Sequence, residues 1–280
     1  MKILSIGDVH GRDIWKFHTH GSSYEYDSWK ISVEAGADAT EYEFWKEYPY
    51  AQVDKIVFVG DYVDSYDKTN EQILENLREI INFKKALGDK VVLLLGNHDI
   101  QYIVPNEICS GFRGEMQFDL AKLFKENIDL FKVAHLEKGQ DGSKWLWSHA
   151  GVTSGWYEKD LLRDMTNERY RFYSITSEFL NEKEREVDEV INKAFELNMT
   201  TLWNVDSHSG GYCVWAGPVW VRPYIMNYWP LEGYNQIMGH TPQGGVWIVD
   251  EDDDKKPYEG FKHHYIDVPH LDQEPLILEI

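Results

Sequence analysis

The sequence predicts an α/β fold with a substantial mixed or antiparallel part. Three near-continuous apolar runs each end at a Gly-Asp or Gly-Asn pair, a pattern typical of strands that are covered on both faces. A helix-forming stretch separates the second run from the third, and the last third of the 280-residue chain holds several short strand-like runs. Strand, helix and strand in this order predict two parallel strands joined by a right-handed crossover.

The first predicted elements lie in the N-terminal third of the chain. We expect strands over residues 2–7, 55–59 and 90–95. Residues 70–87 carry apolar side chains at helical spacing, and Gly88 follows as a helix stop.

Weaker patterns predict the remaining elements. We expect helices over residues 115–126 and 177–198, and a strand over residues 144–148 that ends at His149. The candidate strands of the last third are residues 234–238, 245–249, 261–268 and 276–280.

Two segments interrupt this pattern. Residues 18–50 and 203–234 are rich in aromatic side chains and show little periodicity. Because neither repeats nor low-complexity linkers occur, we interpret the whole chain, residues 1–280, as one domain with two long insertions.

The composition excludes several classes of protein. With 48 acidic against 28 basic residues the formal charge is −20, which disfavours non-specific binding to nucleic acid. No stretch approaches the roughly 20 apolar residues of a membrane span. The first strand begins at Lys2 and leaves no room for a secretory leader, so we expect a cytoplasmic protein. Cys109 and Cys213 fit no metal-binding spacing, and we expect no bridge between them.

Five short motifs carry chemistry, each placed where a predicted strand ends. They combine Asp, His and Asn with small glycine residues, which let the backbone turn and leave room for a ligand. The motifs are Gly7-Asp8-Val9-His10-Gly11, Gly60-Asp61-Tyr62-Val63-Asp64, Gly96-Asn97-His98-Asp99, Ser148-His149-Ala150-Gly151 and Gly239-His240-Thr241-Pro242.

Each motif alone is weak, but together they indicate one site. The ends of several strands meet at one edge of a sheet, which is where open α/β folds bind ligands. Mixed oxygen and nitrogen donors suit Mn, Fe or Zn better than calcium. Two cations roughly 3.5–4 Å apart need a shared carboxylate, and together they can clamp a phosphoryl group during in-line displacement.

The five motifs resemble those of the calcineurin-like metallophosphoesterases, over most of the chain. The motif sequences are most similar to those of the phosphoprotein-phosphatase (serine/threonine phosphatase-like) branch, which includes bacterial and phage members. The fifth motif reads Gly-His-Thr-Pro instead of the Gly-His-x-His of the wider superfamily. The resemblance implies a four-layer αββα sandwich, with two mixed sheets flanked by helices.

The resemblance also implies a role for each motif residue. Asp8 and His10 would bind one metal ion and Asp61 would bridge two. Asn97, which would also contact the substrate phosphate, would hold the second ion with His149 and His240. Outside the metal shell, His98 would protonate the leaving alkoxide and Asp64 would orient its ring. Manganese is the expected metal, with iron or zinc as alternatives.

One motif departs from the branch. In the branch, the second motif is normally followed by Arg-Gly, and the arginine binds the substrate phosphate. This chain has Ser65-Tyr66 at that place. We take Arg222, in a Trp-x-Arg stretch between the fourth and fifth motifs, as the replacement. Arg12 and Arg113 are weaker candidates. The missing Arg-Gly argues against activity on phosphoproteins more than it argues against phosphoesterase activity in general.

Histidines outside the motifs are expected to be structural or on the surface. They are His18, His20, His135, His208, His263, His264 and His270, of which His208 is the one most open to a role at the site.

The predicted activity is hydrolysis of phosphomonoesters by a metal-bridging hydroxide. The substrate would be a phosphorylated small molecule, a nucleotide or a phosphoprotein. One alternative is a nucleotide hydrolase, either a dinucleoside polyphosphatase or a cyclic phosphodiesterase. The other is a non-catalytic scaffold that binds a phosphorylated ligand. The intact ligand set argues against the scaffold, and the sequence leaves oligomeric state and substrate open.

Overall fold

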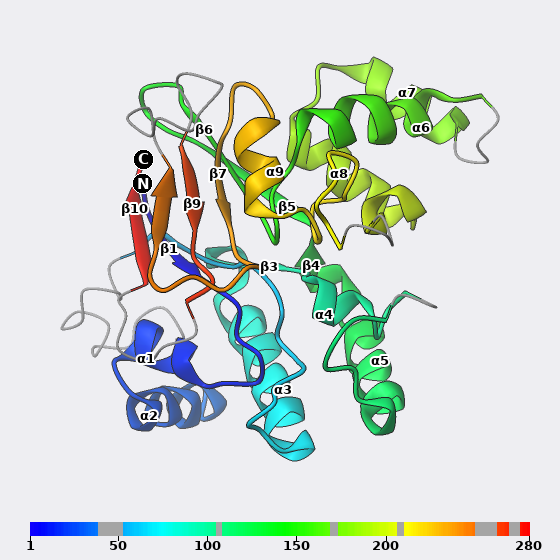
Figure 1. Ribbon diagram of the computed structural model, residues 1–280. Coiled ribbons are helices and arrows are strands. Elements are labelled where there is room, and N and C mark those ends of the chain that lie inside the picture. Colours follow the sequence, from blue (N-terminus) through cyan, green and yellow to red (C-terminus); the bar gives the residue numbers. More distant parts are fainter. Residues whose placement is uncertain (39–52, 105–107, 169–172, 206–209, 250–261, 269–274) are drawn as a thin grey trace. The chain divides into compact units, whose positions relative to one another are not determined.

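The computed structural model describes residues 1–38, 53–104, 108–168, 173–205, 210–249, 262–268 and 275–280. The chain divides into two compact units (Figure 1). The first unit comprises Met1–Phe131 and Val268–Ile280, and the second comprises Lys132–Asp267. Each is built on a five-stranded sheet. The interpretation of the chain as one domain with two insertions stays a prediction.

The first sheet has the strand order β10-β1-β2-β3-β4. Its strands are β1 (Lys2–Ile6), β2 (Lys55–Phe58), β3 (Val91–Leu94), β4 (Phe131–Lys132) and β10 (Leu276–Glu279). β1, β2 and β3 are parallel, as predicted from the apolar runs and the helix between them. β10 pairs antiparallel with β1, so the two ends of the chain lie side by side in Figure 1.

Helix α3 (Asn70–Leu87) is the predicted crossover between β2 and β3. The Thr69 hydroxyl accepts the Gln72 N–H, and the Gln72 side chain accepts the Thr69 N–H, which forms a capping box at the N-terminus. The buried face of the helix packs against β3. The first unit also contains η3 (Gly88–Lys90), α4 (Asn97–Ile100), η4 (Gly114–Met116), α5 (Gln117–Glu126) and η5 (Ile128–Leu130).

The first aromatic insertion begins as two helices, which its weak periodicity did not predict. They are α1 (Ile14–His20) and α2 (Ser23–Glu34), and residues 39–52 lie outside the described part of the chain. Trp15, Tyr26 and Trp29 are buried, and each has its ring within 7 Å of the Phe83 ring on α3. These aromatic residues therefore form part of the core of the first unit.

The second sheet has the order β5-β6-β7-β9-β8. β6 (Lys144–Ser148), β7 (Asn235–Met238) and β9 (His263–Tyr265) are parallel neighbours, while β5 (Ala134–Lys138) and β8 (Trp247–Val249) pair antiparallel at the two edges. The four strands predicted in residues 144–148, 234–238, 245–249 and 261–268 are therefore present within this sheet.

One predicted helix of the second unit was wrong. The predicted helix over residues 177–198 is two helices, α7 (Tyr173–Glu182) and α8 (Val187–Glu196). Glu186 is extended and forms a capping box with Glu189, so a new helix starts there. The unit also contains the π-helix η6 (Gly155–Leu161), α6 (Leu162–Thr166), η7 (Thr200–Trp203) and α9 (Pro223–Tyr228).

The chain thus has a mixed α/β fold with two mixed sheets and helices, as predicted. Both cysteines are free thiols, as expected. Among the described helices, none is long and apolar enough to cross a membrane.

Candidate active site

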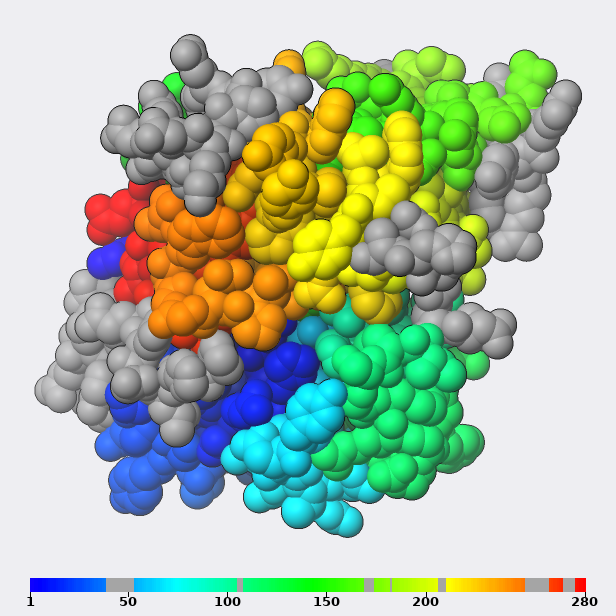
Figure 2. Space-filling model, in the orientation of Figure 1, coloured from blue at the N-terminus to red at the C-terminus, as the bar shows by residue number. Residues whose placement is uncertain are grey.

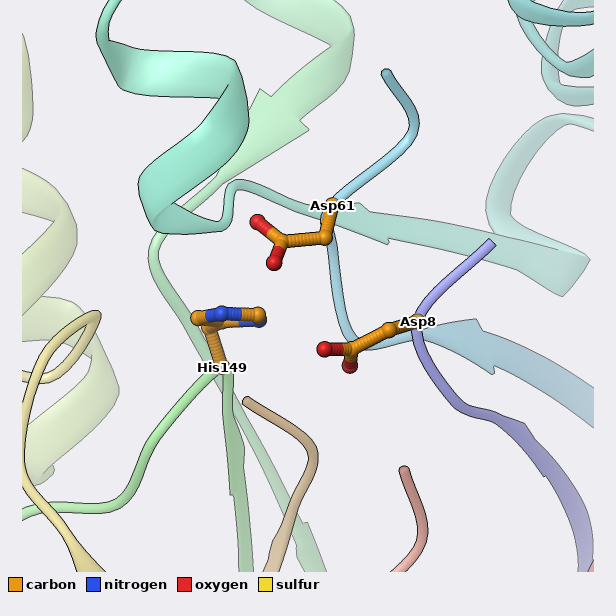
Figure 3. Close-up of side chains that lie close together, drawn as sticks. All are labelled: Asp8, Asp61 and His149. Carbon is orange, nitrogen blue, oxygen red and sulfur yellow. The ribbon is translucent and has the colours of Figure 1, made fainter. Parts of the chain in front are cut away.

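The first and second motifs are joined through their backbones. The N–H groups of Val9 and His10 donate to the Asp61 carbonyl at 3.1 and 2.7 Å, and Gly11 N–H donates to the Tyr62 carbonyl at 2.8 Å. Since β1 and β2 are parallel, both loops leave the same edge of the first sheet. The carboxylates of Asp8 and Asp61 project from these loops in the same direction (Figure 3), with an oxygen of one within 4.8 Å of an oxygen of the other.

His10 is held in the form that can bind a metal ion. Its Nδ1 lies 3.0 Å from the Val63 carbonyl, which fixes the proton on Nδ1 and leaves a lone pair on Nε2. That Nε2 atom lies 3.8 Å from Asp61 Oδ2. Burial lowers the pKa of His10, although the Asp61 charge opposes this. The donor set of Asp8, His10 and Asp61 therefore fits a divalent cation.

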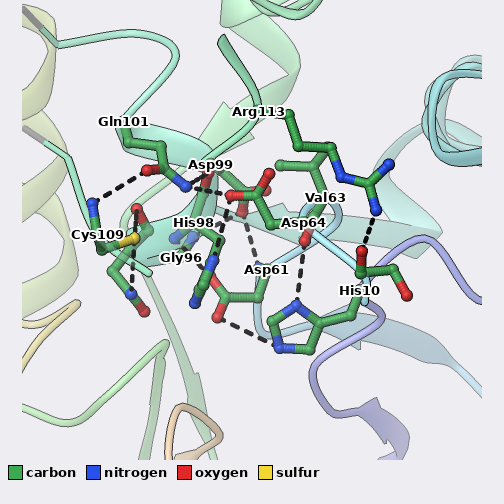
Figure 4. Close-up of polar contacts among 12 residues, drawn as sticks. His10, Asp61, Val63, Asp64, Gly96, His98, Asp99, Gln101, Cys109 and Arg113 are labelled. Atoms are coloured by element: carbon green, nitrogen blue, oxygen red, sulfur yellow. Dashed lines mark hydrogen bonds and ion pairs between the residues drawn. The ribbon is translucent and has the colours of Figure 1, made fainter. Parts of the chain in front are cut away.

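Asp99 anchors the second and third motifs to each other (Figure 4). Its buried carboxylate accepts the N–H groups of Asp61, Tyr62 and Gly96 at 2.8, 2.8 and 2.9 Å. Asp61 Oδ1 in turn accepts the His98 N–H at 2.9 Å. Burial and the Asp61 charge raise the pKa of Asp99 well above its usual range, although the three N–H donors oppose this. This network fixes the Asp61 carboxylate in one orientation.

Two glycines allow this close approach. Gly60 has φ +107°, and a Cβ atom there would lie 2.5 Å from the Gly96 nitrogen. A Cβ atom on Gly96 would in turn meet the Asp61 carboxylate. A side chain at Gly60 would displace the backbone of Leu95 and Gly96, and one at Gly96 would displace Asp61, a predicted metal ligand.

The backbone is strained at the predicted site residues. Five non-glycine residues of the described chain have positive φ, and four of them are His10, Asp61, Asp64 and His240. Such conformations are uncommon for residues with a Cβ atom and cluster at functional sites.

His98 and Asp64 form the predicted acid pair. His98 Nδ1 lies 3.2 Å from Asp64 Oδ2, and the two imidazole rings of His98 and His10 are 5.0 Å apart, edge to face. Asp64 is buried and also accepts hydrogen bonds from the Gln101 amide and the Tyr102 hydroxyl. Three donors thus fix the Asp64 carboxylate in place.

The carboxylates around His98 favour its imidazolium form. Burial lowers the pKa of His98, but the Asp61 charge and the hydrogen bond to Asp64 outweigh it and raise the pKa to about 12. With Nδ1–H directed at Asp64, the second proton sits on Nε2, where a general acid would carry it.

The second unit supplies His149 and His240. They follow the parallel neighbours β6 and β7, and the Gly239 N–H donates to the His149 carbonyl at 2.7 Å. Their ring centroids are 5.1 Å apart, and both side chains are buried. Two adjacent imidazoles at the ends of parallel strands are a nitrogen donor pair that suits a transition metal ion.

Arg222 lies beside the fifth motif. Its guanidinium donates to the Thr241 hydroxyl at 3.2 Å and to the Gly210 carbonyl at 3.1 Å. The weaker candidates are engaged elsewhere: Arg12 pairs with Asp67 at 2.9 Å, and Arg113 donates to backbone carbonyls of Ser65 and Lys68.

Asn97 is the last predicted ligand. It begins α4 directly after β3 and is buried, with its Nδ2 atom 3.6 Å from the Cys109 sulfur. The third parallel strand thus delivers its motif to the same edge of the first sheet as β1 and β2.

Sequence reasoning missed the residues that hold the site in shape. Asp99, Gln101 and Tyr102 contact Asp61 or Asp64, yet none has a pattern that separates it from an ordinary helix residue. The position of Asp99 in the third motif was the one available signal. Of the histidines outside the motifs, the described ones (His18, His20, His135, His263 and His264) are buried as structural residues, while His208 and His270 lie outside the described residues.

Comparison with known proteins gives one family. The family model described as calcineurin-like phosphoesterase matches residues 1–244. No curated protein with a matching sequence was found.

Solved structures give two phosphatases among the similar folds. A cold-active protein-tyrosine phosphatase from a psychrophilic Shewanella species is 17% identical, covers 99% of this chain and 75% of its own, and has a TM-score of 0.46. A protein serine/threonine phosphatase from Saccharomyces cerevisiae, with similarity to human phosphatase PP5, is 16% identical, covers 95% and 67%, and has a TM-score of 0.40.

Proposed function

Because the chain belongs to the calcineurin-like phosphoesterase family and is therefore a metal-dependent phosphoric ester hydrolase, we propose that it hydrolyses phosphomonoesters at a centre of two divalent cations. The observation that carries this proposal is the His98–Asp64 pair, held next to Asp61. A general acid is needed where the leaving group is a poor one such as an alkoxide.

The proposed metal ligands come from both units. Asp8, His10, Asp61 and Asn97 of the first unit, with His149 and His240 of the second, would hold the two cations. The family model supports this grouping because it runs through all six positions. The mixed donors favour manganese, with iron or zinc as alternatives. Bound cations would polarise the phosphate and lower the pKa of an attacking water.

The chain's own residues would prepare the reaction. Asp99 fixes the orientation of Asp61, and the Val63 carbonyl fixes the tautomer of His10. The Asp64 carboxylate keeps the His98 ring oriented, so its Nε2 proton can pass to the leaving oxygen. We assign Arg222 to the substrate phosphate, where its guanidinium would neutralise charge in place of the missing Arg-Gly arginine.

The test is hydrolysis by metal-stripped protein with Mn²⁺, Zn²⁺ or Mg²⁺ added back. We expect turnover of p-nitrophenyl phosphate with Mn²⁺ and a slower rate on the bis-ester. Asp61→Ala should lose bound metal and activity, while Asp119→Ala, a change at an exposed carboxylate on α5, should keep both. Full activity in Asp61→Ala would refute the site. Bound metal without turnover of any ester would favour the scaffold.

A further inference from the structure

An open pocket of about 740 Å³ lies within the second unit, and its volume is typical of small-molecule sites. It is lined by α9, by the fifth-motif loop from Thr241 to Gln243, by β8 and by Tyr212. The segments that form it, residues 210–249 in yellow to orange, reach the surface on the face shown in Figure 2.

Aromatic rings dominate the lining. Tyr212, Tyr224, Tyr228 and Trp247 are 61%, 62%, 40% and 37% exposed, which is unusual for so many large rings around one hollow. The Tyr224 and Tyr228 centroids are 4.8 Å apart. Trp247 stacks on buried Tyr265 at 4.8 Å and 24°, so its indole is held in one orientation. Exposed rings of this kind can bind a flat ligand by stacking.

Two side-chain amides give the pocket a polar edge. Asn227 Oδ1 accepts the Tyr265 hydroxyl at 2.7 Å and lies 3.1 Å from His263 Nδ1, which orients the amide. Gln243 Nε2 donates to the Thr241 carbonyl at 2.9 Å. Among the described residues, Asn227 Nδ2 and Gln243 Oε1 make no hydrogen bond to the protein, so one donor and one acceptor are available to a ligand.

The pocket adjoins the groups assigned to phosphate and metal. Thr241, part of its lining, follows His240 directly, and its hydroxyl accepts the Arg222 guanidinium. A ligand with its phosphate at Arg222 and His240 would therefore extend its leaving group past Thr241 into the pocket.

We propose that this pocket binds the base of a nucleoside monophosphate, so that the phosphomonoester hydrolysed by the protein is a mononucleotide. This inference rests on the proposed function. A phenyl ring would leave the two amides without partners, whereas a heteroaromatic base has donors and acceptors at its edge. The formal charge of −20 disfavours a polynucleotide, but a mononucleotide brings a single phosphate.

The test compares esters that share a phosphate but differ in the leaving group. Wild-type protein with Mn²⁺ should have a kcat/KM for adenosine and uridine 5′-monophosphate at least tenfold above that for ribose 5-phosphate and for phosphotyrosine. In Tyr224→Leu and in Trp247→Leu the preference for the nucleotide over ribose 5-phosphate should fall about tenfold, mainly through KM, which is the size expected for one lost stacking contact. Tyr24→Leu, an exposed tyrosine of α2 outside the pocket, should keep the preference.

Three results would overturn the proposal. The first is an equal kcat/KM for ribose 5-phosphate and the nucleotides, and the second is a higher kcat/KM for phosphotyrosine than for the nucleotides. The third is the same fall in kcat/KM on every ester in Tyr224→Leu and Trp247→Leu.

A second measurement separates the pocket from the chemistry. In saturation-transfer NMR of metal-free protein with adenosine 5′-monophosphate, the base protons should receive saturation from wild-type protein and far less from Tyr224→Leu. This result without turnover of any ester would refute the proposed function and keep the pocket. Turnover of simple esters without base saturation would refute the pocket and keep the function.

Discussion

Replacing Asp99 by Asn tests whether a buried carboxylate holds the site together. Asp99 accepts three backbone N–H groups, from Asp61, Tyr62 and Gly96. The amide of Asn can keep two of these bonds through its oxygen, because Asp61 and Gly96 donate to the same carboxylate oxygen. Its NH₂ group then faces the Tyr62 N–H, so one charge-assisted bond is lost and a buried donor is left without a partner. That costs about 2–3 kcal/mol.

Amide hydrogen exchange measures this cost locally. Two to three kcal/mol corresponds to exchange about 30- to 150-fold faster at the amide of Tyr62, with smaller effects at Asp61 and Gly96. Because Asp61 would be oriented less well, metal affinity should also fall about 10- to 100-fold. Asp119→Asn, at the surface of α5, provides the matched control.

The opposite result would be equally informative. A protonated Asp99 already presents an O–H group, so replacing it by the nearly isosteric amide would leave exchange and metal affinity as they are. Unchanged exchange at Tyr62 would therefore refute the view that Asp99 accepts all three N–H groups as a carboxylate.

Three further predictions concern single residues. His98→Ala should slow hydrolysis of alkyl phosphates about 10²- to 10⁴-fold but affect p-nitrophenyl phosphate much less, and an equal loss on both would exclude an acid role. Gly60→Ala, whose Cβ would lie 2.5 Å from the Gly96 nitrogen, should lower the free energy of unfolding by about 2–4 kcal/mol in urea titrations. Gly36→Ala, with φ +96° and no atom within 4 Å of the new Cβ, should cost about 1 kcal/mol, and similar costs would contradict the steric argument. Burial lowers the pKa of His20 to about 3, against 6.5 in the unfolded chain, so only the unfolded state takes up a proton as the pH falls below 6.5. Between pH 8 and pH 5 wild-type protein should lose about 2 kcal/mol more stability than His20→Gln in urea titrations, and parallel profiles would show that His20 is not buried in neutral form.

The strands that carry the motifs were predictable because each has a clear apolar pattern and a clear end. Near-continuous apolar runs that stop at Gly-Asp or Gly-Asn indicated buried parallel strands, and β1, β2 and β3 pair in that way. The same residues set the site, because a side chain placed after a parallel strand lies at a known edge of the sheet.

Elements stabilised by tertiary packing were harder to predict. α1 and α2 carry aromatic residues whose burial depends on Phe83 of a distant helix, so no local periodicity reveals them. The break between α7 and α8 depends on a capping box between two glutamates within a highly charged run, where many glutamates look alike. Asp99 is similar, since the sequence shows a carboxylate but not which backbone N–H groups it will accept.

The pairing of β10 with β1 has a consequence for synthesis on the ribosome. Strand β1 is made first, but its partner at residues 276–279 is made after the entire second unit. Until then one edge of β1 lacks its neighbour, and an open edge of that kind can pair with another chain. The second unit, made later, can complete its own sheet before the first unit does. Aggregation during expression should therefore depend on residues 276–280, and their removal should destabilise the first sheet more than the second.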